Sequence, residues 1–355
     1  MKVFLDVHVL QSVPPNCLNR DDTGSPKTAV YGGARRARVS SQSWKRAMRL
    51  MFKEYFDEAE LSSRTVKVFD MVAEAITSQA PEHSHEDALK MAQDVLKKVK
   101  VEGKKAADNT DALFFLSNQQ AKNLAAIALG ADKDDEKEIT KALKSGNGVD
   151  LALFGRMVAS NPNLNSDACA QVAHAISTHR VETEFDFFTA VDDRAPKGEE
   201  HAGAGMLGTV EFNSATLYRY ATVAVHDLFC QLAEDPVALA KAVEGFTRAF
   251  ICSIPDGKQN TFAAHTVPDA VLVTLRSDRP LNLVGAFEEP IRGEGLAKAS
   301  AAALTEYALR VYDDFCTKPD KGYVVGESLS QLGQRLPLDD MLNKLGQDVA
   351  DTFKL

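Results

Sequence analysis

The sequence predicts an α+β fold. Segments with helical periodicity fill most of the first half, two β-rich segments follow, and helices and single strands succeed each other in the last third. Strands and helices in this mixed order are typical of α+β proteins. With 45% apolar and 26% charged residues over 355 positions, the composition is that of an ordinary globular protein. Glycine and proline together make up under a tenth of the residues, which excludes a collagen-like or low-complexity chain.

The first half is predicted to contain one strand and a series of helices. Residues 1–10 are predicted to form a strand, because Asp6 and His8 interrupt an apolar run. The same interruption argues against a signal peptide, and no apolar run is long enough to cross a bilayer, so we expect a cytoplasmic protein. Prolines and glycines predict loops over 11–39. Helices are predicted over 42–56, 63–79, 85–99 and 112–129, and another begins in the acidic run 132–138.

The second half is predicted to begin with an extended arm. Residues 181–191 and 209–225 are rich in β-branched and aromatic residues, and the segment between them contains a proline and several glycines. This pattern predicts two long strands joined by a mobile loop that protrudes from the protein. A helix over 236–252 and a buried strand over 270–275 are predicted to follow. Two further helices are predicted over 296–315 and 338–353.

The charge is unevenly distributed along the chain. The net charge is −9, but the first 50 residues contain nine basic and three acidic side chains and so carry +6. The remaining 305 residues must then carry −15. Such asymmetry is typical of proteins that bind nucleic acid through a local basic surface. The acidic total excludes a uniformly cationic nucleic-acid binder, but it does not exclude a locally cationic one.

Residues 31–49 combine a glycine pair, an arginine-rich stretch and a helix. Gly32-Gly33 permits a tight turn, and Ser40 and Ser41 are both favourable N-cap residues. Trp44, Met48, Met51, Phe52 and Tyr55 recur on one helical face, whereas Lys45, Arg49 and Lys53 recur on another. An arginine loop that leads into a basic helix suits phosphate oxygens. The alternative interpretation is a solvated basic face without a ligand.

The sequence offers no recognised catalytic or metal-binding motif. P-loop, nucleophile-elbow, zincin and dinucleotide-binding patterns are all missing. The five cysteines are scattered, none in a C-x-x-C spacing, and predict neither disulfides nor a zinc site. His83 and His85 stand near a predicted helix start, where polar residues are expected. We therefore expect no cofactor and no metal.

An RNA-cleaving enzyme stays open as an alternative. His174 and His179 could act as acid and base, although histidines with structural partners or at the surface are more common. Asp186, Asp192 and Asp193, beside the predicted arm, could also cleave RNA, but nothing in their spacing requires it.

Several long segments resemble one known family. They include Gly32-Gly33 through Arg49, Gly155-Arg156-Met157 and Tyr218-Arg219-Tyr220, with further matches at residues 8–10, 17–22, 149–154, 173–179, 187–193 and 258–264. In these segments the chain is similar to the CasC-type backbone subunit of the type I-E CRISPR surveillance complex (Cascade), a member of the RAMP superfamily. The match is weakest over residues 60–130 and after about residue 320.

The resemblance implies a hand-like shape. A modified RRM (ferredoxin-like) palm is expected from residues 1–50 and 181–355. A mainly helical fingers domain is expected from 51–180, and a β-hairpin thumb at about 183–220. The sequence lacks the aromatic RNP1 motif, so base stacking on the sheet is not expected.

The resemblance also implies the residues that bind nucleic acid. A guide must be held whatever its sequence, so contacts to phosphate and sugar are expected. The expected RNA contacts are Asn19, Arg20, Lys27, Arg35, Arg36, Ser40, Gln42, Lys45, Arg49, Met157, Phe188, Thr189, Lys258 and Asn260. Met157 would wedge against displaced bases, and Phe188 and Thr189 would fill the gap left by a flipped base. For Met157 and Phe188 the alternative is core packing. Target DNA contacts are expected at Lys137, Lys141 and Lys144.

The expected function is that of a non-catalytic, crRNA-binding backbone subunit. The resemblance implies partners in the crRNA guide, target DNA through the guide, further copies of the chain in a hexameric backbone, other Cascade subunits and, indirectly, the nuclease-helicase. No membrane partner is expected. The remaining alternative is a RAMP-type endoribonuclease that cuts target or precursor RNA.

Overall fold

The computed structural model describes residues 1–103, 109–110, 112–130, 135–189 and 207–354. A large mixed sheet dominates this part of the chain, with strand order β12-β11-β10-β1-β9-β7-β3-β2 and with β6 and β8 paired to β9. Its strands are β1 (Phe4–Asn16), β2 (Thr28–Tyr31), β3 (Ala34–Val39), β6 (Ala170–Val172), β7 (Ala175–Ser177), β8 (Glu184–Thr189), β9 (Leu207–Ala224), β10 (Ala270–Arg276), β11 (Lys321–Val325) and β12 (Gln334–Arg335).

The central strand β1 has antiparallel neighbours on both sides, β9 and β10. Its side chains alternate between the two faces of the sheet. Leu5, Val7 and Val9 belong to one apolar cluster, and Leu10 belongs to another on the opposite face. Because the strand is buried on both faces, a polar side chain on it needs a hydrogen-bond partner inside the protein. His8 is an example, since its Nδ1 lies 2.9 Å from the Tyr218 hydroxyl.

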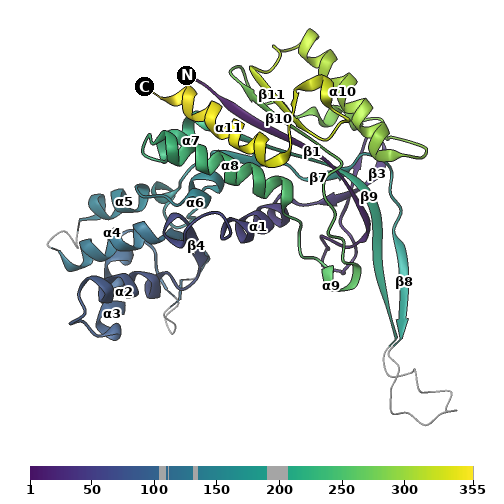
Figure 1. Ribbon diagram of the computed structural model, residues 1–355. Coiled ribbons are helices and arrows are strands. Elements are labelled where there is room, and N and C mark those ends of the chain that lie inside the picture. Colours follow the sequence, from purple (N-terminus) through teal and green to yellow (C-terminus); the bar gives the residue numbers. More distant parts are fainter. Residues whose placement is uncertain (104–108, 111, 131–134, 190–206, 355) are drawn as a thin grey trace, which may run out of the picture.

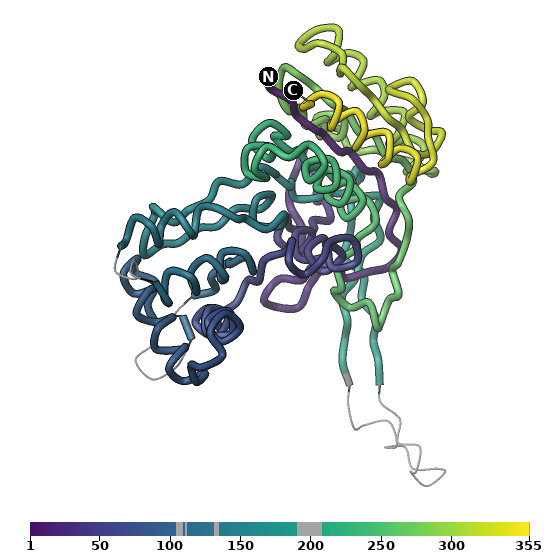
Figure 2. Tube along the Cα trace, turned by 60° about the vertical axis from the view of Figure 1, so that its left-hand side comes forward, coloured from purple at the N-terminus to yellow at the C-terminus, as the bar shows by residue number. Residues whose placement is uncertain are grey.

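Helices cover both faces of the sheet (Figures 1 and 2). The larger cluster joins one face to α1 (Ser41–Phe52), α6 (Val149–Phe154), α7 (Val225–Gln231), α8 (Pro236–Cys252) and α11 (Leu338–Phe353). The other face packs on α10 (Leu296–Asp314) and the 3₁₀ segments η3 (Leu283–Phe287) and η4 (Ser330–Leu332). The short helix α9 (Gln259–Phe262) follows α8 and precedes β10 in the sequence.

A helical unit with its own apolar cluster lies beside the sheet. It consists of α2 (Val68–Gln79), α3 (His85–Lys98), α4 (Asn118–Leu129) and α5 (Glu136–Lys144), with the 3₁₀ turn η2 (Pro162–Leu164). The antiparallel pair β4 (Ser62–Thr65) and β5 (Phe114–Ser117) stands between this unit and α1. In Figure 1, α1 lies between the helical unit and the long hairpin formed by β8 and β9.

The hairpin protrudes from the sheet (Figures 1 and 2). Glu184 pairs with Phe212 and Thr189 with Leu207, while β9 continues to Ala224 in the middle of the sheet. The expected pair of long strands is therefore confirmed. The connecting segment, with Asp192 and Asp193, lies outside the described residues.

Most predicted elements are confirmed, but several segments differ from the prediction. The loops expected over 11–39 include the end of β1, which continues to Asn16, and strand β2 over Thr28–Tyr31. The structure has the expected helix over Pro236–Cys252 and the expected helix over Leu338–Phe353. Residues 63–79 and 112–129 do not form single helices, because each begins with a strand of the β4–β5 pair. Residues 34–39 form strand β3 and not an arginine loop, because they pair with β2 and β7. These pairings join distant segments, which local periodicity does not reveal.

Residues 170–177 require a correction to the expected fingers range of 51–180. Strands β6 and β7 pair with β9, and α6 packs in the cluster of the large sheet. The separate apolar cluster of the helical unit extends only from Val68 to Leu164. The chain thus returns to the sheet earlier than expected, because β6 pairs with β9 and β7 lies inside the sheet between β9 and β3.

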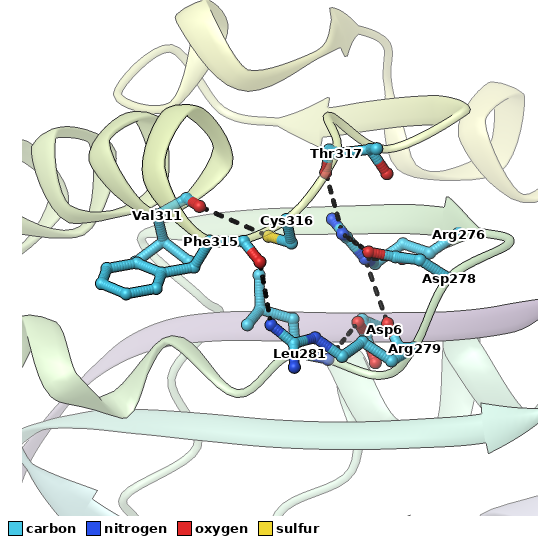
Figure 3. Close-up of polar contacts among 9 residues, drawn as sticks. All are labelled: Asp6, Arg276, Asp278, Arg279, Leu281, Val311, Phe315, Cys316 and Thr317. Carbon is cyan, nitrogen blue, oxygen red and sulfur yellow. Dashed lines mark hydrogen bonds and ion pairs between the residues drawn. The ribbon is translucent and has the colours of Figure 1, made fainter.

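A buried polar network closes the sheet at the end of β10 (Figure 3). Arg276 donates to the Asp278 carboxylate at 2.8 Å and to the Thr317 carbonyl at 2.8 Å, which links β10 to the segment after α10. Asp6 accepts from the Leu281 main chain at 2.9 Å and from the Tyr220 hydroxyl at 2.8 Å. Burial raises the pKa of Asp6 to about 6.

Among the described helices, none is both long and apolar enough to span a bilayer.

Candidate nucleic-acid interface

Helix α1 presents a basic face away from the core. Ser40 caps its first turn by accepting from the Ser43 main chain, and Trp44, Met48 and Phe52 are buried below it. The predicted apolar face is therefore confirmed. Lys45 and Arg49 are partly exposed on the other face, and Gln42 and Lys53 are exposed. Ser40 itself is buried, and its hydroxyl oxygen is used in the helix cap.

Lys45 and Arg49 lie near the boundary between the sheet and the helical unit, Lys45 beside α6 and Arg49 beside β5. Lys45 Nζ lies 5.6 Å from the Phe154 ring centroid, and burial lowers the pKa of its ammonium. The Arg49 guanidinium lies 4.6 Å above Phe115, and its Nε is 3.3 Å from the Asp150 carboxylate. In the described part of the chain, the Arg49 Nη groups have no hydrogen-bond partner. Both cationic side chains can thus bind an anion that approaches from the solvent.

Two loops flank the N-terminus of α1. Asn19 Oδ1 accepts from the Ser40 main chain at 2.9 Å, which fixes the loop before β2 to the helix. A Cβ on Gly257 would lie 2.2 Å from the Leu18 carbonyl, so only glycine permits this contact between the two loops. A polar cavity of about 500 Å³ between them is lined by Asn19, Arg20, Ser43, Asp256 and other loop residues. Arg20 and Asn260 are exposed and Lys258 is half-buried.

The buried Arg219 fixes α1 from below. Its guanidinium lies 3.7 Å from the Trp44 ring centroid and 4.8 Å from that of Phe250. It donates to the Gln11 side chain at 2.6 Å and to the Phe250 carbonyl. Burial lowers the pKa of Arg219 to about 9, so it stays charged at neutral pH. Strand β9 therefore determines where the basic helix lies.

The β2–β3 hairpin divides its arginines between core and surface. Arg36 is fully buried and donates four hydrogen bonds, all to main-chain carbonyls of Tyr31, Ser177, Phe287 and Glu288. The expected phosphate contact of Arg36 is therefore corrected to a structural role, because its donors are already occupied. Arg35 is exposed and Lys27 is half-buried, which leaves both accessible.

Met157 stands on the surface of the helical unit. Its side chain is 84% exposed, although the neighbouring Arg156 and Val158 are buried. The alternative of core packing is thus wrong for Met157. Its side chain helps to line a cavity of about 610 Å³, together with Leu113, Phe114 and other residues.

The β8 strand carries an exposed aromatic surface. Phe185 and Phe187 are 67% and 65% exposed, and Phe188 is 41% exposed. The Phe188 ring packs against Gly208 of β9, where a Cβ would lie 2.4 Å from it. Thr189 is exposed at the end of the strand. Core packing is therefore excluded for Phe188 within the described chain.

Helix α5 presents the predicted lysines to solvent. Lys137, Lys141 and Lys144 are exposed, while Ile139, Ala142 and Leu143 are buried beneath them. Lys141 lies 3.6 Å from Glu138, an exposed pair that contributes little stability. The lysines therefore remain available to an anionic ligand.

The geometry does not support the histidine-based ribonuclease. His179 Nε2 accepts from the Thr216 main chain at 3.0 Å, and its Nδ1 contacts the Arg180 carbonyl at 2.8 Å. With both nitrogens engaged, His179 cannot exchange a proton with a substrate without losing a structural bond. Among the described residues, no group of three or more acidic, histidine or cysteine side chains could hold a metal.

Sequence reasoning missed two contributors to this surface. Arg38 Nη1 lies 3.1 Å from Nδ1 of His174. Desolvation lowers the pKa of His174, and the charges of Arg38 and then Lys27 lower it further. The arginine-rich stretch could have indicated Arg38. Asp150 could not be found in this way, because it is 101 residues from Arg49 in sequence.

Comparisons with known proteins identify the family. The matching family model, described as CT1975-like protein, covers residues 5–347. Comparison with curated proteins found no match. One similar solved structure is titled "CRISPR RNA-guided surveillance complex, pre-nicking" (33% identity, TM-score 0.81, 96% of this chain and 100% of that chain). Another is titled "CRISPR RNA-guided surveillance complex" (29% identity, TM-score 0.62, 96% and 99%). The α+β fold is thereby confirmed. The chain belongs to the CT1975-like family of CasC-type subunits of the type I-E Cascade crRNA-guided surveillance complex, which are generally non-catalytic.

Proposed function

We propose that the basic face of α1 holds the crRNA backbone, independently of its sequence. The observation that carries this proposal is the position of Lys45 and Arg49 on a rigid, capped helix at the boundary between sheet and helical unit. Arg20, Lys258 and Asn260 extend the surface beyond the helix N-terminus, and Lys27 and Arg35 extend it along the hairpin. Cationic side chains and a helix N-terminus bind phosphate without reading bases.

We propose that the sheet, the helical unit and the β8–β9 hairpin are palm, fingers and thumb. In this arrangement the hairpin crosses the guide and displaces one base at regular intervals. Phe188 and Thr189 would occupy the resulting gap, and Met157 would wedge against the displaced base. An exposed, unbranched and polarizable side chain suits such stacking. The exposed aromatic side chains of β8 are consistent with a thumb that contacts a ligand or neighbour.

The proposed assembly is a row of identical subunits along one guide. Copies of this chain would form a hexameric backbone that joins other Cascade subunits and, indirectly, the nuclease-helicase. Target DNA would pair with the guide and contact Lys137, Lys141 and Lys144 on α5, which are exposed on one helix face. Acidic surfaces elsewhere would limit nonspecific binding.

The double variant Lys45→Ala/Arg49→Ala tests the phosphate contacts. It should weaken binding to unrelated guide sequences by the same factor and should flatten the salt dependence. The double variant Lys90→Ala/Lys97→Ala on α3 is a matched control that removes two lysines from the helical unit. Equal affinity with an altered sequence preference would contradict the proposal. Electron microscopy of the co-expressed complex would test the assembly, which requires a filament along RNA.

A further inference from the structure

Arg156 and Met157 are sequence neighbours with opposite environments. The Arg156 side chain is buried, whereas Met157 is 84% exposed. The Arg156 guanidinium donates to the carbonyls of Leu164 at 3.0 Å, Phe115 at 3.1 Å and Leu143 at 2.6 Å. It also donates to the Gln120 side chain at 3.2 Å. A buried cation is thus the chain neighbour of a side chain that is almost fully exposed.

These acceptors come from four separate segments of the helical unit. Phe115 is in β5, Gln120 in α4, Leu143 in the last turn of α5, and Leu164 in the turn η2. The guanidinium also lies 5.0 Å from the Phe114 ring centroid. No carboxylate contacts it within the described residues, so its burial costs free energy that the four acceptors must offset. A lysine cannot reproduce this set, since its donors diverge from one nitrogen and not from a planar fork.

The main chain around Met157 is held on both sides. Arg156 and Ser166 exchange two main-chain hydrogen bonds of 2.9 Å, and the Val158 main chain donates to Asn165 Oδ1 at 2.7 Å. Gly155 has φ of +73°, and a Cβ there would lie 2.8 Å from the Ser166 carbonyl. The turn therefore has little freedom to retract Met157 toward the protein.

We propose that Arg156 is a positioning residue, which holds Met157 against the displaced guide base and ties it to the lysine-bearing helix α5. The inference rests on the proposed role of Met157 in the preceding subsection. It adds that the wedge and the α5 lysines move as one body, because Arg156 bonds the carbonyl of Leu143, next to Lys144. The guide-facing and DNA-facing surfaces of the subunit are then mechanically joined.

The test uses the full chain assembled on a guide RNA that carries 2-aminopurine at successive positions. The fluorescence of this base rises when it is unstacked, so displaced positions appear as periodic maxima. Met157→Ala should lower these maxima. Arg156→Lys should lower them to the same level, with guide affinity within about two-fold of the original. The double variant should equal Met157→Ala alone, since residues that act through each other are not additive.

Two further variants separate positioning from general stability. Arg276→Lys is the matched control, because Arg276 is also buried and bonded to carbonyls, but it lies in the network of Figure 3, where no guide contact is proposed. It should lower the unfolding temperature and leave the fluorescence maxima intact. Asn165→Ala removes the exposed side of the clamp. It should reduce the maxima even if Arg156→Lys does not fold.

Each outcome decides between the two proposals. If Met157→Ala leaves the maxima unchanged, the proposed role of Met157 fails, and the role of Arg156 fails with it. If Met157→Ala lowers them but the Arg156 and Asn165 variants do not, only the positioning role is overturned. Additive losses in the Arg156→Lys/Met157→Ala double variant would likewise assign Arg156 a separate, purely structural effect.

Discussion

The Arg49–Asp150 ion pair allows the phosphate contacts of α1 to be separated by charge. Lys45 has no acidic partner in the described chain, whereas Arg49 is 3.3 Å from a carboxylate that is itself almost fully buried. Burial raises the pKa of Asp150, although its bonds to Arg49 and Ser62 act in the opposite direction. As the ion-pair partner of Arg49, the Asp150 carboxylate offsets part of the charge that Arg49 offers to a phosphate.

The magnitudes follow from counterion release. Each phosphate that a cation neutralises on single-stranded nucleic acid contributes about 0.7 to the slope of log K against log salt. Lys45→Ala should flatten the slope by about 0.7, and Arg49→Ala by less, because Asp150 already neutralises part of its charge. Asp150→Asn frees Arg49 and should steepen the slope by up to about 0.7, with tighter binding at low salt.

Stability should change in a different pattern. Arg49→Ala leaves the Asp150 carboxylate buried with one main-chain donor, from Ser62 at 2.8 Å. A lost hydrogen bond to a charged group costs about 2 kcal/mol of unfolding free energy. The double variant Arg49→Ala/Asp150→Asn removes the unpaired charge and should recover part of this loss, without recovery of RNA affinity. Lys45→Ala should cost less, since no buried charge is left behind.

Fluorescence anisotropy of two unrelated guide RNAs over a KCl series measures the slopes, and urea unfolding measures stability. The reasoning would be refuted if Asp150→Asn weakened RNA binding at low salt. That result would mean that Asp150 is needed to orient Arg49, or that Arg49 does not face a phosphate. Equal slope changes for Lys45→Ala and Arg49→Ala would show that Asp150 does not neutralise Arg49.

Three other predictions concern pH, backbone geometry and DNA. Burial lowers the pKa of the His8 imidazole to about 3, so between pH 7.5 and 5 the unfolded chain binds a proton at this residue that the folded chain does not bind. His8 should therefore lower the unfolding free energy by about 2 kcal/mol over this range, while Asp6, whose pKa is raised to about 6, acts in the opposite direction. In urea titrations at both pH values, His8→Gln should lose about 2 kcal/mol less than the original chain, and an equal loss in both proteins would contradict this. Gly32→Ala should destabilise the protein far more than Gly33→Ala, which should cost about 1 kcal/mol of unfolding free energy. Both glycines have positive φ, but only at Gly32 would a Cβ meet the Glu288 carbonyl, at 1.6 Å. Similar unfolding midpoints for the two variants would contradict this. The triple alanine variant of the α5 lysines Lys137, Lys141 and Lys144 should leave guide affinity unchanged. It should flatten the slope of log K against log salt for target DNA binding by about 0.9 for each lysine that contacts a phosphate. An unchanged slope would exclude α5 from the DNA interface.

The α+β class, most of the long helices and the basic helix α1 could be predicted from the sequence alone. Apolar residues at helical spacing, as in Trp44, Met48 and Phe52, depend on one segment and its own periodicity, so they can be recognised locally. The same holds for the exposed lysine face of α5 and for the two long strands of the hairpin. The charge asymmetry also indicated a basic surface in the first 50 residues, where Lys45 and Arg49 are partly exposed on α1.

Which charged side chains are exposed and which are held by buried partners could be seen only in the folded chain. Arg35 and Arg36 are adjacent in the same arginine-rich stretch, yet one is exposed and the other is buried under four carbonyl bonds, because successive side chains of a strand point to opposite faces. Asp150 reaches Arg49, and Arg156 reaches Leu143, Phe115 and Leu164, only after helices from separate segments pack together. Desolvation and long-range hydrogen bonds set these roles, and neither leaves a periodic pattern in the sequence.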